Sequence, residues 1–90
     1  MLNTTTLGKI IIEGVTVDGE IFRPSDWAER LSGRLATFYK QRIIYSPLML
    51  PEMRNGVKCI VIDKEMKNAH PELFAHTLEF AALNHLKVVF

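Results

Sequence analysis

Residues 57–63 read VKCIVID, a run that is apolar on both faces when placed in an extended strand. Such strands lie in the middle of a sheet, where both faces are covered. A second run rich in Ile and Val, KIIIEGVTV at residues 9–17, has the same character. We therefore expect residues 9–17 and 57–63 to be the two central strands of one sheet.

Turn signals flank both runs. Asp18-Gly19 predicts a type I′ hairpin turn, because both of its central positions need a positive φ, and a short return strand at residues 20–22 should follow. Asn55-Gly56 marks a turn before residue 57. Two further β-type segments are expected at residues 43–50, where Pro47 favours a sheet edge, and at residues 87–90.

Two helices complete the pattern. The first begins at Pro24-Ser25-Asp26, where Ser25 or Asp26 can cap the free amides. At about 100° per residue its apolar side chains fall within one arc. They are Trp27, Ala28, Leu31, Leu35, Phe38 and Tyr39. Residues 64–70 are expected to be irregular, and the second helix follows from Pro71 to Asn84. Asn84 would end this helix in a left-handed conformation. The side chains that face the core are Leu73, Phe74, Thr77, Leu78, Phe80 and Ala81.

Without the return strand, this order is βαββαβ. We expect an α+β fold of the ferredoxin-like type, with both helices on one face of a mainly antiparallel sheet and an extra short hairpin strand after the first strand. The alternative is a mixed sheet that includes residues 20–22 as a full member. A chain of 90 residues fits one domain, at residues 9–90 after a flexible leader at 1–8.

The run FRPSDWAERL, residues 22–31, resembles the signature of a family of small bacterial proteins known only as a domain of unknown function. The resemblance extends to the Asp-Gly turn upstream, to YSP at 45–47, to NGVKC at 55–59 and to LKVV at 86–89. It implies no activity, because the family has none to transfer to any residue here.

The composition of the chain argues against several classes of function. The net charge of +1 argues against a dedicated nucleic-acid binder, and no apolar run approaches the roughly 20 residues that a membrane span needs. The candidate central strands also lack the aromatic side chains with which RNA-recognition domains stack bases. A lone cysteine suits a reducing compartment, so we expect a cytoplasmic protein.

A candidate ligand site lies at the start of the first helix. Arg23, Ser25, Asp26 and Arg30 could hold a small anionic metabolite beside the free amides. The structural interpretation is a helix cap, a core Trp27 and an Asp26–Arg30 pair at i,i+4. The Asp26 carboxylate favours the second interpretation, because it would compete with an anion for the same amides.

Other polar residues carry weaker signals. Glu72, His76 and Glu79 share one helical face but lack an obvious ligand from another element, so no metal site and no cofactor are expected. Cys59 in a central strand is expected to be a buried, inert thiol, and no catalytic residue is assigned.

An interaction surface is the last candidate. Residues 48–54 read LMLPEMR, and in an exposed loop this segment would present Leu48, Met49, Leu50 and Met53 to a partner. The open face of the sheet should also leave several Ile or Val side chains uncovered, which favours a homodimer or a protein partner there. The competing interpretation is that the loop folds over one end of the sheet. Together these features predict a non-enzymatic interaction or regulatory module, with anionic-metabolite binding as the alternative.

Overall fold

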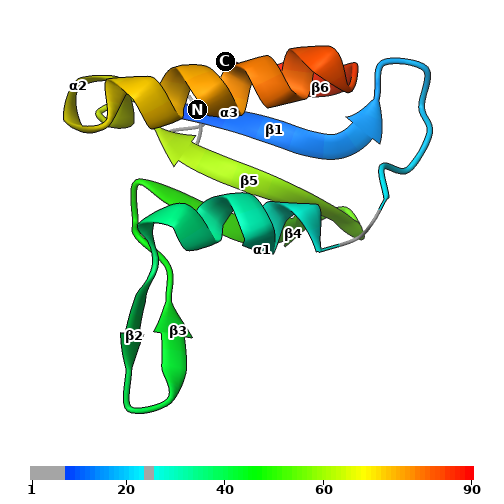
Figure 1. Ribbon diagram of the computed structural model, residues 1–90. Helices are drawn as coiled ribbons and strands as arrows, with labels where there is room; N and C mark the ends of the chain where they lie inside the picture. The colour runs from blue at the N-terminus through cyan, green and yellow to red at the C-terminus, as the bar shows by residue number, and fades with distance from the viewer. Residues whose placement is uncertain (1–7, 24–25) are drawn as a thin grey trace, which may run out of the picture.

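The computed structural model describes residues 8–23 and 26–90 and has a four-stranded sheet at its centre (Figure 1). Its strands are β1 (Lys9–Thr16), β4 (Met49–Arg54), β5 (Val57–Asp63) and β6 (Leu86–Val89), in the order β4-β5-β1-β6. Every neighbouring pair is antiparallel. The two Ile- and Val-rich runs are therefore central, as the sequence predicts. Of the expected leader, only Gly8 lies within the described residues.

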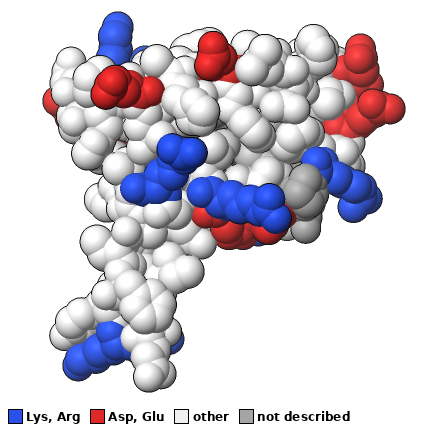
Figure 2. Space-filling model, in the orientation of Figure 1, with Lys and Arg blue, Asp and Glu red and all other residues white. Residues whose placement is uncertain are grey.

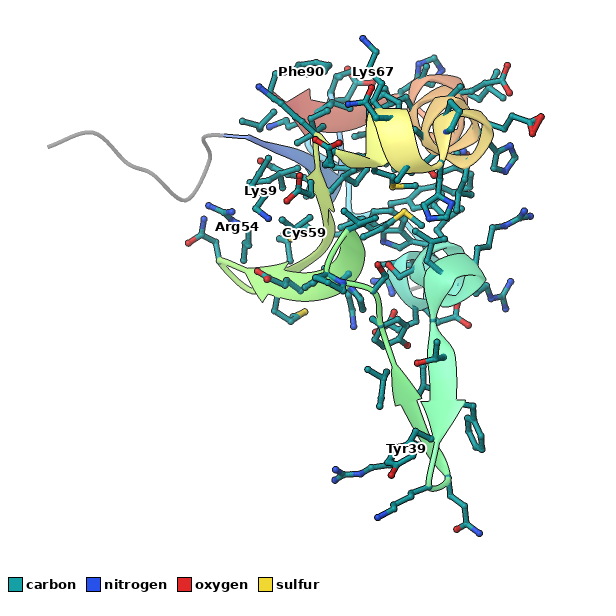
Figure 3. All side chains as sticks on the ribbon, turned by 90° about the vertical axis from the view of Figure 1, so that its left-hand side faces the viewer. Lys9, Tyr39, Arg54, Cys59, Lys67 and Phe90 are labelled. Carbon is teal, nitrogen blue, oxygen red and sulfur yellow. The ribbon has the colours of Figure 1, made fainter. Side chains whose placement is uncertain are left out.

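Helices cover one face of this sheet. They are α1 (Trp27–Ser32), the short α2 (Met66–Ala69) and α3 (Pro71–Leu83), and a 3₁₀ turn at Gly33–Leu35 follows α1. Figures 1 and 3 show α1 and α3 on the same side of the sheet. Among the described residues, no helix is long and apolar enough to cross a membrane. The chain is thus a small mixed α/β domain with an antiparallel sheet.

The core lies between the helices and this face of the sheet. Its fully buried members come from every major element, namely Ile10, Ile12, Trp27, Ala28, Leu31, Met49, Ile60, Ile62, Met66, Ala81 and Leu86. The predicted buried face of α3 is confirmed, because Thr77 and Ala81 are buried and Leu73, Phe74, Leu78 and Phe80 are partly so.

The first helix is shorter than its apolar arc predicts. It ends at Ser32, and Thr37–Tyr39 forms strand β2, paired with β3 (Arg42–Ile44) in a separate two-stranded sheet. Phe38 and Tyr39 are exposed there, so their assignment to the buried helical face is wrong. The local sequence explains this difference, because Thr, Tyr, Phe and Ile prefer extended backbone. The three residues of β2 can then pair with the three residues of β3 across a turn at Lys40-Gln41.

The segment after Pro47 is an edge strand, not an exposed loop. Residues 43–50 do not form one strand, because β3 ends at Ile44 and β4 begins at Met49. Pro51 is tolerated in β4 because an edge strand need not donate every amide to a neighbour. Met49 is 0% exposed and belongs to the core, so its assignment to an interaction surface is wrong. Leu48 and Leu50 are half-buried, and only Met53 is well exposed.

Turn geometry confirms one expectation and corrects three others. Asn55 and Gly56 both have positive φ, at 53° and 77°, as in a type I′ turn. At residues 18–19 only Gly19 is positive, at 90°, and the return strand is reduced to one bridge between Val15 and Ile21. The left-handed residue after α3 is His85 at 57°, because Asn84 keeps φ −103° and instead donates its side-chain amide to the Phe80 carbonyl.

A glycine lets α1 approach the sheet. A Cβ on Gly14 of β1 would lie 2.5 Å from the Lys58 carbonyl oxygen and 3.0 Å from Nε1 of Trp27. Both distances are shorter than ordinary van der Waals contact, so a side chain fits at this position only if the β5 backbone at Lys58 and the Trp27 ring both move.

Gly14→Ala should therefore lower the free energy of unfolding by about 1 to 3 kcal/mol, the usual range for an overpacked core. Gly33→Ala is the matched control, because its Cβ would meet nothing within 4 Å and its φ of −61° suits alanine. That control should be neutral or stabilise by up to about 1 kcal/mol. Urea unfolding of both variants measures the difference, and equal stabilities would refute the close approach.

Candidate functional site

The predicted anion site at the start of α1 is partly described. Ser25 lies outside the described residues, and Arg23 is exposed. Asp26 occupies the N-cap position without a side-chain cap bond. Its carboxylate accepts a hydrogen bond from Nε of Arg30 at 2.9 Å instead. The i,i+4 pair expected from the structural interpretation is thus present, and Trp27 is buried as that interpretation requires.

A groove runs between α1 and α3, and its floor is aromatic. Phe22, Trp27 and Phe80 contact one another there, with ring centroids 5.8 to 6.1 Å apart. Trp27 and Phe80 are nearly parallel, whereas Phe22 meets both of them edge-on. The hollow above these rings has a volume of about 240 Å³. No sequence pattern indicates this groove, because Phe22 and Phe80 are far apart in the chain.

Two arginines and one leucine complete the groove. Leu31, Arg30 and Arg34 come from α1 and the 3₁₀ turn that follows it. Figure 2 shows basic side chains gathered over this part of the molecule. The i,i+4 spacing of the two arginines is a sequence signal that places them side by side on one helical face.

Polar contacts hold α1 in place beside the groove. Lys58 of β5 donates to Glu29 of α1, which joins the helix to the sheet. Three buried polar atoms have no hydrogen-bond partner among the described residues: Nε1 of Trp27, Oε1 of Glu29 and Oγ of Ser32. Because Nε1 lies over Gly14, the indole N–H points toward the sheet and not into the groove.

The β2–β3 hairpin, here called the arm (residues 37–44), extends away from the rest of the molecule (Figure 1). Its apolar side chains are exposed, and they are Phe38, Tyr39, Ile43 and Ile44. Phe38 pairs across the strands with Ile43, and Tyr39 pairs with Arg42. The arm therefore has apolar side chains on both faces, since successive strand residues point to opposite sides.

The arm is also basic. Residues 37–44 contain two cationic residues, Lys40 and Arg42, and no acidic residue. The whole chain carries +1, so the residues outside the arm carry −1. The ammonium of Lys40 lies 5.3 Å from the centroid of the Tyr39 ring, within cation–π range.

The open face of the sheet is less exposed than its sequence suggests. Ile11 and Cys59 are buried there although no helix covers them, and Val57 and Val61 are half-buried. Figure 3 shows Cys59, Lys9 and Arg54 on the side of the sheet away from the helices. The expectation that several Ile or Val side chains of the central strands stay uncovered is therefore wrong for Ile11, whereas Val57 and Val61 remain partly exposed.

Burial, hydrogen bonds and charges on the open face perturb the pKa values of Cys59 and Asp63. Burial, then the nearby Glu52 carboxylate, raises the pKa of the Cys59 thiol. The Glu65 backbone N–H and the Lys9 ammonium lower the pKa of Asp63, with Nζ of Lys9 at 3.0 Å. Cys59 lines a hollow of about 200 Å³ with Glu13 and Arg54, but its thiol has no positive environment strong enough to ionise it.

The described residues hold no group of three or more His, Cys, Asp or Glu side chains that could bind a metal ion. Glu72 and His76 of α3 are exposed on its solvent side, as is Glu79.

Comparison with known proteins gives one family and one solved structure. The family described as "Protein of unknown function (DUF3579)" matches residues 6–90. A solution structure, described as the first structural representative of its family, shares 37% sequence identity with the chain and superposes with a TM-score of 0.80. The match covers 91% of this chain and 77% of that one. No curated protein matches the chain.

Cys59 should react with a chromogenic thiol reagent only after unfolding, because it is 1% exposed and its raised pKa keeps the thiol protonated at neutral pH. The labelling rate of the native protein should rise with denaturant concentration and reach the rate of a free thiol above the unfolding midpoint. Rapid labelling without denaturant would show that the open face gives access to the sulfur.

Proposed function

The chain belongs to the DUF3579 family of proteins of unknown function, and we propose that it is a non-enzymatic interaction module whose docking element is the arm. One observation carries this proposal. Four large apolar side chains of the arm are exposed together on a projecting two-stranded ribbon, and clustered exposure of this kind marks contact surfaces.

The energetics of the arm support docking. Each of its strands has three residues, and an isolated two-stranded hairpin is marginally stable at best. Its turn adds a cost, because Lys40 and Gln41 have φ values of 49° and 62° without the freedom of glycine. Each residue in that region costs about 1 to 2 kcal/mol. A partner that buries the apolar side chains would offset both effects.

We take the partner to be a second copy of the chain. The arm carries +2 and the remainder of the chain −1, so an arm approaching the body of another copy is attracted to it. Burying even two of the exposed side chains contributes about 1.5 to 3 kcal/mol each. This homodimer differs from the one expected from sequence, because the arm and not the open sheet face is the contact.

Finer assignments belong to the same proposal. The sheet order β4-β5-β1-β6 with α1 and α3 on one face supports a ferredoxin-like classification, with the arm as an insertion. The FRPSDWAERL run at residues 22–31 is proposed as the family signature. A single, buried, unpaired cysteine supports a reducing compartment, and we propose a bacterial cytoplasm.

Light scattering at tens of micromolar should give twice the chain mass of 10.3 kDa. Phe38→Glu should reduce it to 10.3 kDa without changing the far-ultraviolet circular dichroism, because Phe38 lies outside the core. Leu83→Glu is the matched control, since Leu83 of α3 is 73% exposed and Phe38 is 71% exposed.

The control should remain a dimer. A wild-type mass of 10.3 kDa would contradict self-association, and an equal loss of mass in both variants would contradict the role of the arm.

A further inference from the structure

We propose that the groove between α1 and α3 binds a small aromatic carboxylate. The proposal is independent of self-association, because no residue lining the groove belongs to the arm. It also differs from the anion site expected at the start of α1, because the ligand would lie against the side of that helix.

The floor of the groove selects an aromatic ring. Phe22 and Phe80 present ring faces and edges beside Trp27, and aromatic pairs prefer such offset or edge-on contacts. The hollow of 240 Å³ lies just below the range of about 300 to 1,000 Å³ typical of sites for drug-sized ligands. A ligand with one or two rings therefore matches the space.

The two arginines at the rim of the groove favour a ligand that has a carboxylate group. Arg34 makes no ion pair with any carboxylate of residues 8–23 and 26–90. Arg30 uses its Nε for Asp26, which leaves its terminal amino groups for another acceptor. A guanidinium offers two parallel donors, and this geometry fits a carboxylate better than a single polar atom. An aromatic ring on the floor and a carboxylate at the rim would satisfy both features at once.

Trp27 gives a direct readout, because it is the one tryptophan in the chain and it lines the groove. The test is an NMR titration of the ¹⁵N-labelled protein with hydrocinnamate, and with hydrocinnamyl alcohol as the neutral counterpart. Hydrocinnamate should shift the backbone amides of Trp27, Leu31 and Phe80 saturably at millimolar concentrations. The carboxylate should bind about tenfold more tightly than the alcohol, which corresponds to about 1.4 kcal/mol.

Arg34→Gln should weaken hydrocinnamate binding by about threefold to fivefold, the effect of removing one exposed ion pair. Arg42→Gln is the matched control, because Arg42 is an exposed arginine of the arm, and it should leave the affinity unchanged. Three results would overturn the proposal: no saturable shift, equal affinities for the carboxylate and the alcohol, or an unchanged affinity in Arg34→Gln.

Discussion

The packing of Trp27 against Gly14 is the contact on which the rest of this structure depends. Helix α1 has six residues, far below the roughly 12 to 15 at which an isolated helix becomes even marginally stable. It is held by burial of Trp27, Ala28 and Leu31 on the sheet, and Gly14 makes room for the indole. The Lys58–Glu29 ion pair adds a polar link between the helix and β5. Without the close approach at Gly14, the indole could not lie this near the sheet.

The shortness of α1 and its packing on the sheet have two consequences. Because the helix covers only part of the sheet, a groove remains between α1 and α3, and Trp27 forms part of its floor. Because the helix ends at Ser32, the chain leaves the body and forms the arm before it returns as β4. The groove and the arm therefore both result from the short length of α1, although their surfaces have different side chains. The groove combines aromatic rings with guanidinium groups, whereas the arm exposes apolar side chains on both faces.

Sequence patterns predicted the elements that burial dictates. Residues 57–63 and the run from Lys9 form the central strands, and Pro71 begins α3. Phe38 satisfies the helical arc of Trp27 and also the alternation of a strand, and only its pairing with Ile43 decides between the two. The groove could not be predicted, since no local pattern brings Phe22 beside Phe80. The Leu48 to Met53 segment is expected to be an exposed loop, whereas residues from Met49 onward form edge strand β4, which accommodates Pro51.

Amide hydrogen exchange at two protein concentrations tests most directly whether the arm depends on a partner. Cross-strand amides of the arm are expected to exchange rapidly in dilute solution and to become protected as concentration rises. Amides of β1 and β5 should be strongly protected at both concentrations, because the sheet and its core do not need a second copy. Arm amides that are as protected as those of β5 in dilute solution would contradict the account, since the arm would then be stable alone.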